Sequence, residues 1–132
     1  MRILIVDNDP DTVEATKAII TAMTPYQVDV AYSGKTGLEK MQAEPAYDLL
    51  ILDIMMPEMS GIDVCKMMMA DEKLKKIPIL LASALPVGSP EFKASLTEFA
   101  ELQLVTAVLE KPFAAEDLIA KMNAILGRKK TP

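Results

Sequence analysis

Short apolar runs alternate with longer segments of mixed polarity, and this alternation continues along the whole chain. The runs are rich in Ile, Leu and Val and are bounded by Pro, Gly, Asp or Ser. Such runs are typical of strands that are buried on both faces of a parallel sheet, although the second one alternates only weakly. The pattern predicts five strands, over residues 2–6, 27–31, 49–54, 77–81 and 106–109.

The segments between these runs carry helix signals. Asp9 before Pro10 fits an N-cap followed by proline at the first helical position. Ser60 and Asp63 have the spacing of a capping box, with Asp in place of Glu. Gly127 follows the last apolar helix face and predicts its end. The expected helices cover residues 10–23, 33–43, 60–71, 91–101 and 114–126.

Strand and helix therefore alternate five times, with no internal repeat and no second domain. This order predicts a parallel sheet with right-handed crossovers and helices on both faces. We expect an α/β protein of three layers, a doubly wound (βα)5 domain over residues 1–127, followed by a short basic tail over residues 128–132.

The composition limits the chemistry that the chain can perform. Its 132 residues include 51% apolar and 25% charged residues, as in an ordinary soluble protein. The net charge of −5 argues against nucleic-acid binding. No membrane span or signal peptide is visible, so we expect a cytoplasmic protein without membrane contact. Histidine is absent and Cys65 is the one cysteine, which leaves carboxylates, hydroxyls, lysines and a hard metal ion for any chemistry.

Polar residues follow four of the five predicted strands. Because all strands of such a sheet point the same way, the residues just past their ends share one edge, where ligands bind. Carboxylate oxygens at this edge are suited to Mg²⁺, and a lysine and a hydroxyl can hold phosphoryl oxygens. A carboxylate among them could attack phosphorus and form an aspartyl phosphate. The residues at this edge are Asp7, Asn8, Asp9, Asp53, Ser83 and Lys111.

Four motifs in this order resemble those of response regulator receiver domains: LIVDND at 4–9, LDIMMPEMSG at 52–61, ASA at 82–84 and EKPF at 110–113. The resemblance extends over nearly the whole chain. It implies a flavodoxin-like sheet of five parallel strands in the order 2-1-3-4-5. It also implies a signalling protein of a two-component phosphorelay whose only reactions are its own phosphorylation and dephosphorylation.

The resemblance assigns a role to each residue at the strand ends. Asp53 corresponds to the phosphoacceptor, Ser83 to the switch hydroxyl and Lys111 to the phosphate-binding lysine. Pro112 would follow a cis peptide bond. The magnesium ligands would be Asp7, Asn8, Asp53 and the main-chain carbonyl of Met55.

The same resemblance implies partners. The phosphoryl donor would be a histidine kinase or a histidine phosphotransfer protein. A downstream protein would bind the face formed by helix four (91–101), strand five and the last helix. Because the sequence ends just after its last helix, we expect the signal to pass to a noncovalent partner.

Two positions depart from the family pattern. Asn8 stands where the second acidic residue is usual, and the loss of one charge predicts weak magnesium binding. Asp9 could compensate, but its place before Pro10 favours a role as helix cap. Val108 stands where receivers usually carry an aromatic residue that turns inward on activation, so signalling by that rotamer change is not available to this chain.

These departures leave two alternatives open. The first is a degenerate receiver that keeps the fold as a protein-binding module and is phosphorylated poorly or not at all. The second is a phosphatase resembling the haloacid dehalogenase family, because Asp7, Asn8 and Asp9 spell its D-x-D pattern after a strand. That family requires Thr or Val two residues after the second Asp, where this chain has Asp11, which argues against it.

Overall fold

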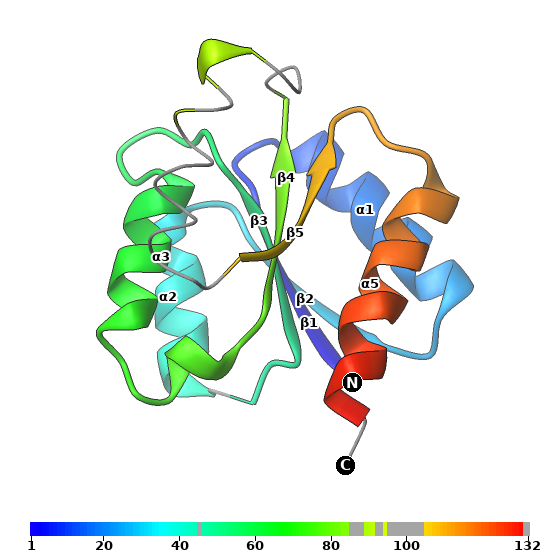
Figure 1. The fold of residues 1–132 in the computed structure, drawn as a ribbon, viewed down its shortest axis with the longest axis horizontal. Helices are drawn as coiled ribbons and strands as arrows, with labels where there is room; N and C mark the ends of the chain where they lie inside the picture. The colour runs from blue at the N-terminus through cyan, green and yellow to red at the C-terminus, as the bar shows by residue number, and fades with distance from the viewer. Residues whose placement is uncertain (45, 85–88, 92–93, 95–104, 131–132) are drawn as a thin grey trace.

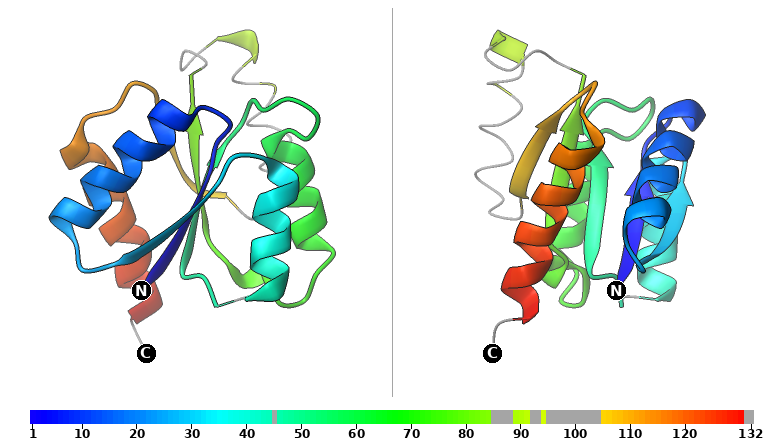
Figure 2. Two further views of the ribbon diagram at one scale, coloured as in Figure 1. Left: turned by 180° about the vertical axis from the view of Figure 1, so that it is seen from behind. Right: turned by 90° about the vertical axis from the view of Figure 1, so that its right-hand side faces the viewer.

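The computed structural model describes residues 1–44, 46–84, 89–91, 94 and 105–130, and these form one parallel sheet between two layers of helices (Figures 1 and 2). The strand order is β2-β1-β3-β4-β5, and each neighbouring pair is parallel. The predicted three-layer, doubly wound fold and the flavodoxin-like order are both confirmed. The strands are β1 (Arg2–Val6), β2 (Gln27–Ala31), β3 (Leu49–Asp53), β4 (Ile79–Ser83) and β5 (Val105–Glu110).

Helices α1 and α5 cover one face of the sheet, and α2 and α3 cover the other (Figures 1 and 2). No helix among the described residues is long and apolar enough to cross a membrane. The bounds are α1 (Pro10–Met23), α2 (Gly34–Ala43), α3 (Gly61–Met69) and α5 (Ala115–Lys130), with a 3₁₀ turn η1 (Leu74–Lys76).

The strands β3 and β4 are apolar at every position before their last residue, because both faces of the sheet are covered. Leu50 and Leu52 of β3 point into the core beneath α2 and α3, whereas Leu49 and Ile51 point into the core beneath α1 and α5. Alternate side chains of a strand face opposite sides, so a strand buried on both sides must be apolar throughout. Asp53 continues the register of this strand and is buried as well.

The predicted N-caps of α1 and α3 are confirmed. Asp9 is the N-cap of α1, and its carboxylate accepts a hydrogen bond from the amide of Asp11. The capping box of α3 is present: the amide of Asp63 donates to the Ser60 hydroxyl, and the amide of Ser60 donates to the Asp63 carboxylate. These caps fix where α1 and α3 begin, directly beside the strand ends that carry the candidate site.

Two predicted elements have wrong boundaries, and a third is not tested. The helix expected to reach residue 71 ends at Met69, and the side chain of Asp71 instead accepts from the amides of Lys73 and Leu74 in the turn that leads into η1. The strand expected over residues 77–81 is Ile79–Ser83, because η1 extends the preceding connection to Ile77. Most of the helix expected over residues 91–101 lies outside the described residues.

The last helix also differs from the prediction. It runs from Ala115 to Lys130, so Gly127 is not its cap, and residues 128–130 belong to the helix rather than to a tail. Glycine inside a helix costs only about 1 kcal/mol relative to alanine. The buried face of α5, with Leu118, Met122 and Ile125, stabilises the helix enough to tolerate that cost.

Candidate functional site

Asp53 is the last residue of β3 and is 6% exposed. It lies beside Ala82 of β4, and the amide of the next residue, Ile54, donates to the Ala82 carbonyl at 3.3 Å. The Ile54 carbonyl in turn accepts from the amide of Gly61, the first residue of α3, at 2.9 Å. The backbone around the buried carboxylate is therefore tied both to the next strand and to the start of α3.

Asp7 follows β1, the strand next to β3, and is 4% exposed. Its amide donates to the carbonyl of Ala31 at 3.1 Å, which continues the pairing of β1 with β2. One carboxylate oxygen of Asp7, Oδ1, accepts from the amide of Asp9 at 2.9 Å. The neighbouring strands thus place two buried carboxylates at the same edge of the sheet.

Lys111 reaches both carboxylates from the end of β5. Its Nζ lies 2.6 Å from Asp7 Oδ2 and 3.4 Å from Asp53 Oδ1. The amide of Lys111 donates to the carbonyl of Ser83, the last residue of β4, at 2.6 Å. The peptide bond between Lys111 and Pro112 is cis, as predicted. The structure therefore brings together Asp7, Asp53 and Lys111, with Ser83 fully buried at the adjacent strand end.

Two buried carboxylates share a single ammonium group in this site. Burial raises the pKa of Asp53 to about 6, and the charge of Asp7 adds to the rise, whereas Lys111 and the amide of Met55 oppose it. Burial is the largest contribution to the raised pKa of Asp53, because the ionised carboxylate loses most of its hydration at this buried position. The site is thus short of positive charge, and an additional cation would fit its chemistry.

The other two residues of the acidic segment do not add to this buried charge. Asn8 is exposed and neutral. The carboxylate of Asp9 serves the start of α1, because it accepts from the Asp11 amide at 3.3 Å and from the Thr12 hydroxyl at 2.6 Å. Among the described residues, no three or more Asp, Glu, Cys or His side chains gather where they could hold a metal ion.

Sequence reasoning missed the contribution of α1 to the site. Thr12 and Thr16, one helical turn apart, line a small cavity of about 10 Å³ together with Asp7, Asp53, Lys111 and Phe113. Thr16 is 3% exposed, and its hydroxyl donates to the carbonyl of Thr12. The signal in the sequence was a polar residue, Thr16, at a core position of an amphipathic helix.

Sequence reasoning also missed the conformation of the loop that follows Asp53. Glu58 has a φ of 67°, and the amide of Met59 donates to the carbonyl of Pro57 at 2.7 Å across it. A hydrogen bond that spans one residue of positive φ is the mark of a strained γ-turn. Nothing in the letters P-E-M distinguishes this turn from an ordinary one.

The fold and the site together define a doubly wound α/β domain with buried carboxylates and a lysine at one edge of its sheet, and comparison with known proteins gives its family. Residues 3–123 match the response regulator receiver domain, and the chain belongs to this family. Proteins of this family are components of two-component systems; they are signalling proteins rather than classical enzymes, typically bind Mg²⁺ and have histidine kinases as partners.

The similar proteins agree with this assignment. Response regulator MprA of Mycobacterium avium (strain 104) is 36% identical over 130 residues, which cover 98% of this chain and 53% of that protein. The chain thus spans about half the length of the curated relatives it matches.

The similar structures are of receiver domains. Chemotaxis protein CheY4 of Vibrio cholerae has a TM-score of 0.82 at 27% identity, covering 94% of this chain and 97% of that chain. A putative response regulator of Chloroflexus aurantiacus has a TM-score of 0.82 at 29% identity, covering 96% of this chain and 98% of that chain.

Proposed function

We propose that the chain accepts a phosphoryl group on Asp53 and signals by the resulting change of its surface. The observation that carries this proposal is the position of Lys111 Nζ, 2.6 Å from Asp7 and 3.4 Å from Asp53. A lysine held between two buried carboxylates is placed to bind an oxygen of a phosphoryl group attached to either of them. Asp53, at the end of a central strand, is the proposed nucleophile.

Each residue of the site has a proposed role in the transfer. An oxygen of the Asp53 carboxylate attacks phosphorus while the bond to the donor breaks. Lys111 and the hydroxyl of Ser83 bind the equatorial oxygens, and Asp7 holds Lys111 in place before transfer.

Asp7, Asn8, Asp53 and the main-chain carbonyl of Met55 would hold Mg²⁺, which when bound offsets the repulsion between the carboxylate and the phosphoryl group. We expect this binding to be weak. Only Asp7 and Asp53 contribute charge, Asn8 is a neutral ligand, and Asp9 is engaged as the cap of α1.

The proposed phosphoryl donor is a histidine kinase or a histidine phosphotransfer protein, and the proposed location is the cytoplasm. The proposed surface for a downstream partner is the face of helix four, β5 and α5, of which helix four falls largely outside the described residues. A near-complete switch between two states requires about 5.5 kcal/mol of differential stabilisation. A new dianion bound to Lys111 and Ser83 can supply stabilisation on this scale.

Incubation with a small-molecule phosphodonor and Mg²⁺, followed by intact mass spectrometry, tests the proposal. We expect one added phosphoryl group on the parent protein and none on Asp53→Asn. Asp11→Asn, which removes an exposed carboxylate of α1, is the matched control and should be phosphorylated like the parent. Absence of the mass increase at saturating Mg²⁺ would refute the proposal.

The second candidate is a binding module that keeps the receiver fold and is hardly phosphorylated. The observation that favours it is the engagement of Asp9, which leaves the metal site without a replacement for the missing acidic residue. The same engagement argues against a phosphatase, since the second Asp of a D-x-D pattern would have to face the site. If the parent remains unmodified while Asn8→Asp gains a phosphoryl group, the binding module is the correct description.

A further inference from the structure

A small cavity lies beside the candidate site, between α1 and the ends of the strands. Its volume is about 10 Å³, and it is lined by residues of β1, β3, β4 and α1 and by the start of the connection from β5 to α5. One water molecule fits a cavity of about this volume, provided that about two to four polar groups can bind it. The polar residues of the lining are Asp7, Thr12, Thr16, Asp53 and Lys111.

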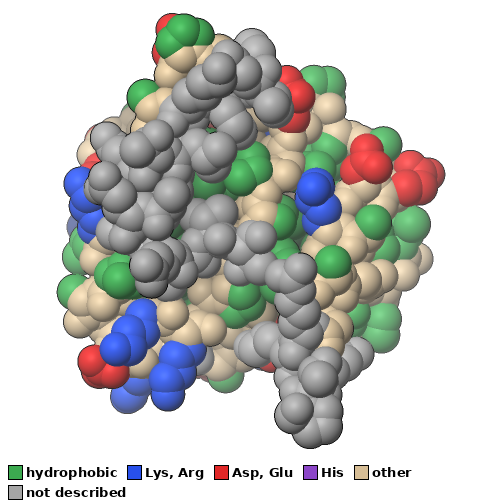
Figure 3. Space-filling model, in the orientation of Figure 1, with side chains coloured by type: hydrophobic (Ala, Val, Ile, Leu, Met, Phe, Trp, Pro, Cys, Tyr) green, Lys and Arg blue, Asp and Glu red, His purple; other side chains and the backbone are tan. Residues whose placement is uncertain are grey.

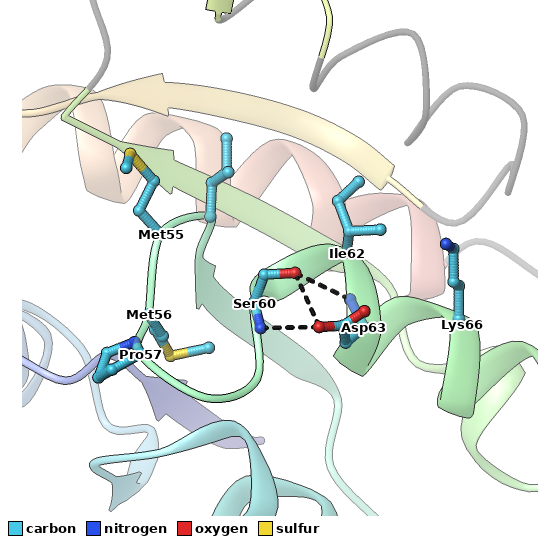
Figure 4. Close-up of a pocket in the computed structure, with 8 residues that line it drawn as sticks. Met55, Met56, Pro57, Ser60, Ile62, Asp63 and Lys66 are labelled. Atoms are coloured by element: carbon cyan, nitrogen blue, oxygen red, sulfur yellow. Dashed lines mark hydrogen bonds between the residues drawn. The ribbon is translucent and has the colours of Figure 1, made fainter.

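The larger hollow near Asp53 is of a different kind. It is a groove of about 620 Å³ on the opposite face of the sheet, beside α3. Figure 4 shows Ser60 and Asp63 in its lining, joined by the hydrogen bonds that form the capping box of α3. These two polar groups therefore serve the start of the helix. The polar groups of the small cavity, by contrast, retain bonding capacity, as its threonines and its lysine show.

The two threonines can accept further hydrogen bonds. Thr16 is 3% exposed, and its hydroxyl donates its one proton to the carbonyl of Thr12 at 2.7 Å. The hydroxyl of Thr12 donates its proton to Asp9 Oδ2 at 2.6 Å. A hydroxyl has one proton and two acceptor lone pairs. Both threonines can therefore accept a bond from a donor in the cavity, but neither has a proton left to donate.

Lys111 can donate a further hydrogen bond. Its ammonium group has three N–H bonds, and the two carboxylates at 2.6 and 3.4 Å account for two of them. The outer surface gives little help in holding this group. In Figure 3 acidic side chains gather at the upper right, over the start of α5, where Glu116 and Asp117 are exposed. Solvent and salt screen such exposed charges, so the groups that hold Lys111 are those inside the site.

We propose that the cavity binds one water molecule, which accepts a hydrogen bond from Lys111 and donates one to the hydroxyl of Thr16 and one to the carboxylate of Asp53. These bonds use the capacity that the direct contacts of Lys111 and Thr16 leave open. About three hydrogen bonds to buried polar groups are typical of an internal water in a protein. The water would therefore connect α1 to the lysine and to the proposed nucleophile.

Thr16 is then a positioning residue of the site. The ammonium group of a lysine is carried on a flexible stem of four carbons, so contacts must hold it where it acts. Thr16 is buried within α1, and the water transmits its fixed position to Lys111. This role rests on the proposed function, in which Lys111 binds an oxygen of the phosphoryl group on Asp53. Loss of the Thr16 hydroxyl should misplace Lys111 and slow the transfer, since transfer depends on the placement of its groups.

Crystal structures of the parent and of two variants, grown without Mg²⁺, test the water directly. Thr16→Val keeps the shape of the side chain and removes the hydroxyl, whereas Thr16→Ser keeps the hydroxyl. We expect one ordered water within hydrogen-bonding distance of residue 16, Lys111 and Asp53 in the parent and in Thr16→Ser, and none there in Thr16→Val. Absence of this water from the parent, or its presence in Thr16→Val, would overturn the proposal. The result does not depend on whether the protein is phosphorylated.

The rate of phosphorylation by a small-molecule phosphodonor, compared with stability in urea, tests the positioning role. Thr16→Val should be phosphorylated about tenfold more slowly than the parent. Its free energy of unfolding should be no lower, because a methyl group replaces a buried hydroxyl. Thr16→Ser should recover most of the rate although it is less stable, because it loses a buried methyl group. Rate and stability thus change in opposite directions, which a merely structural role of Thr16 would not produce.

Thr21→Val is the matched control on the same helix. The Thr21 hydroxyl also donates to the carbonyl four residues earlier, that of Lys17, at 2.8 Å, but its side chain is exposed. Its loss should leave the rate of phosphorylation unchanged. Equal slowing by Thr21→Val, or no slowing by Thr16→Val, would overturn the positioning role while the proposed function stands. If the parent takes up no phosphoryl group, the proposed function fails, and the crystal structures still decide the water site.

Discussion

Gly61 lies directly against the backbone of Asp53. A Cβ atom at position 61 would stand 2.6 Å from the Asp53 carbonyl oxygen and 3.1 Å from the Cα of Ile54. Real Cβ atoms do not approach backbone atoms this closely, so the first residue of α3 must be glycine for the strand end to keep its place. The position of the proposed nucleophile thus depends on the absence of a side chain eight residues further along the chain.

Gly61→Ala is therefore expected to lower the free energy of unfolding by about 1–3 kcal/mol, the usual cost of forcing an extra methyl group into a packed site. The obstacle is backbone rather than a flexible side chain, so the strand end itself must move. Urea unfolding followed by circular dichroism measures the loss. Phosphorylation of Asp53 should be slowed in the same variant.

Gly127→Ala is the matched control, because a Cβ there meets nothing within 4 Å and the position is inside α5. It should raise the free energy of unfolding by up to about 1 kcal/mol through helix propensity. If both substitutions changed stability in the same direction and by the same amount, the close approach of Gly61 would not be the cause.

Asn8→Asp is expected to tighten Mg²⁺ binding about tenfold or more. The substitution adds a third carboxylate to the proposed metal site, beside Asp7 and Asp53, and close opposite charges interact by a few kcal/mol near a protein surface. Isothermal titration calorimetry with MgCl₂ measures the affinity.

Asp9→Asn serves as the comparison. Asp9 caps α1 through the Asp11 amide and the Thr12 hydroxyl, so its loss should leave the Mg²⁺ affinity unchanged. The loss of charge at the helix start should lower the stability slightly. An Asn8→Asp protein that binds Mg²⁺ no more tightly than the parent would show that charge at position 8 does not limit the site.

The sequence was sufficient to predict the layers of the fold and the edge that carries the site. Continuous apolar runs such as residues 49–52 belong to strands buried on both faces, and parallel strands bring their ends to one edge. That argument placed Asp7, Asp53, Ser83 and Lys111 at this edge without any measured distance. It also assigned Asp9 to the helix cap, which the hydrogen bonds confirm.

The remaining features depend on packing that a linear pattern does not contain. Lys111 lies closer to Asp7 than to Asp53, although β5 is nearer to β3 than to β1 in the sheet. Gly127 continues α5 because the buried face of the helix outweighs the propensity of one glycine. The γ-turn at Glu58 lies in the loop that returns the chain to Gly61, whose amide donates to the carbonyl of Ile54. In each case tertiary contacts overrule the local preference.

Tyr47 is expected to make stability sensitive to high pH. Its hydroxyl donates to Asp29 Oδ2 at 2.6 Å, and burial together with the Asp29 charge raises the pKa of Tyr47 to about 12, from an ordinary value of 10.0. A raised pKa in the folded protein means that this stabilisation is complete below pH 10 and is lost as the pH rises from 10 to 12. Between pH 10 and 12, Tyr47 is ionised in the unfolded chain but keeps its hydroxyl proton in the folded protein.

The measurement is the free energy of unfolding of the parent minus that of Tyr47→Phe, as a function of pH. This difference should be constant from pH 7 to 9 and should fall as the pH rises through the window above. Burial also raises the pKa of Cys65 to about 12, but this thiol is present in both proteins and cancels in the difference. A difference that stays flat to pH 12 would show that Tyr47 ionises equally easily in the folded and unfolded states.

Glu58→Asn is expected to stabilise the protein, because Glu58 has a φ of 67° in a γ-turn closed by Met59 and Pro57. The left-handed region costs a residue with a Cβ about 1–2 kcal/mol of conformational energy. Asparagine tolerates this region better than glutamate does. We expect a gain of about 0.5–1 kcal/mol in the free energy of unfolding, measured by urea unfolding.

Glu39→Asn, at an exposed position of α2, is the control, and it should lower stability slightly because asparagine is a poorer helix former. A Glu58→Asn protein less stable than the parent would mean that the glutamate side chain contributes more to this loop than its backbone strain costs.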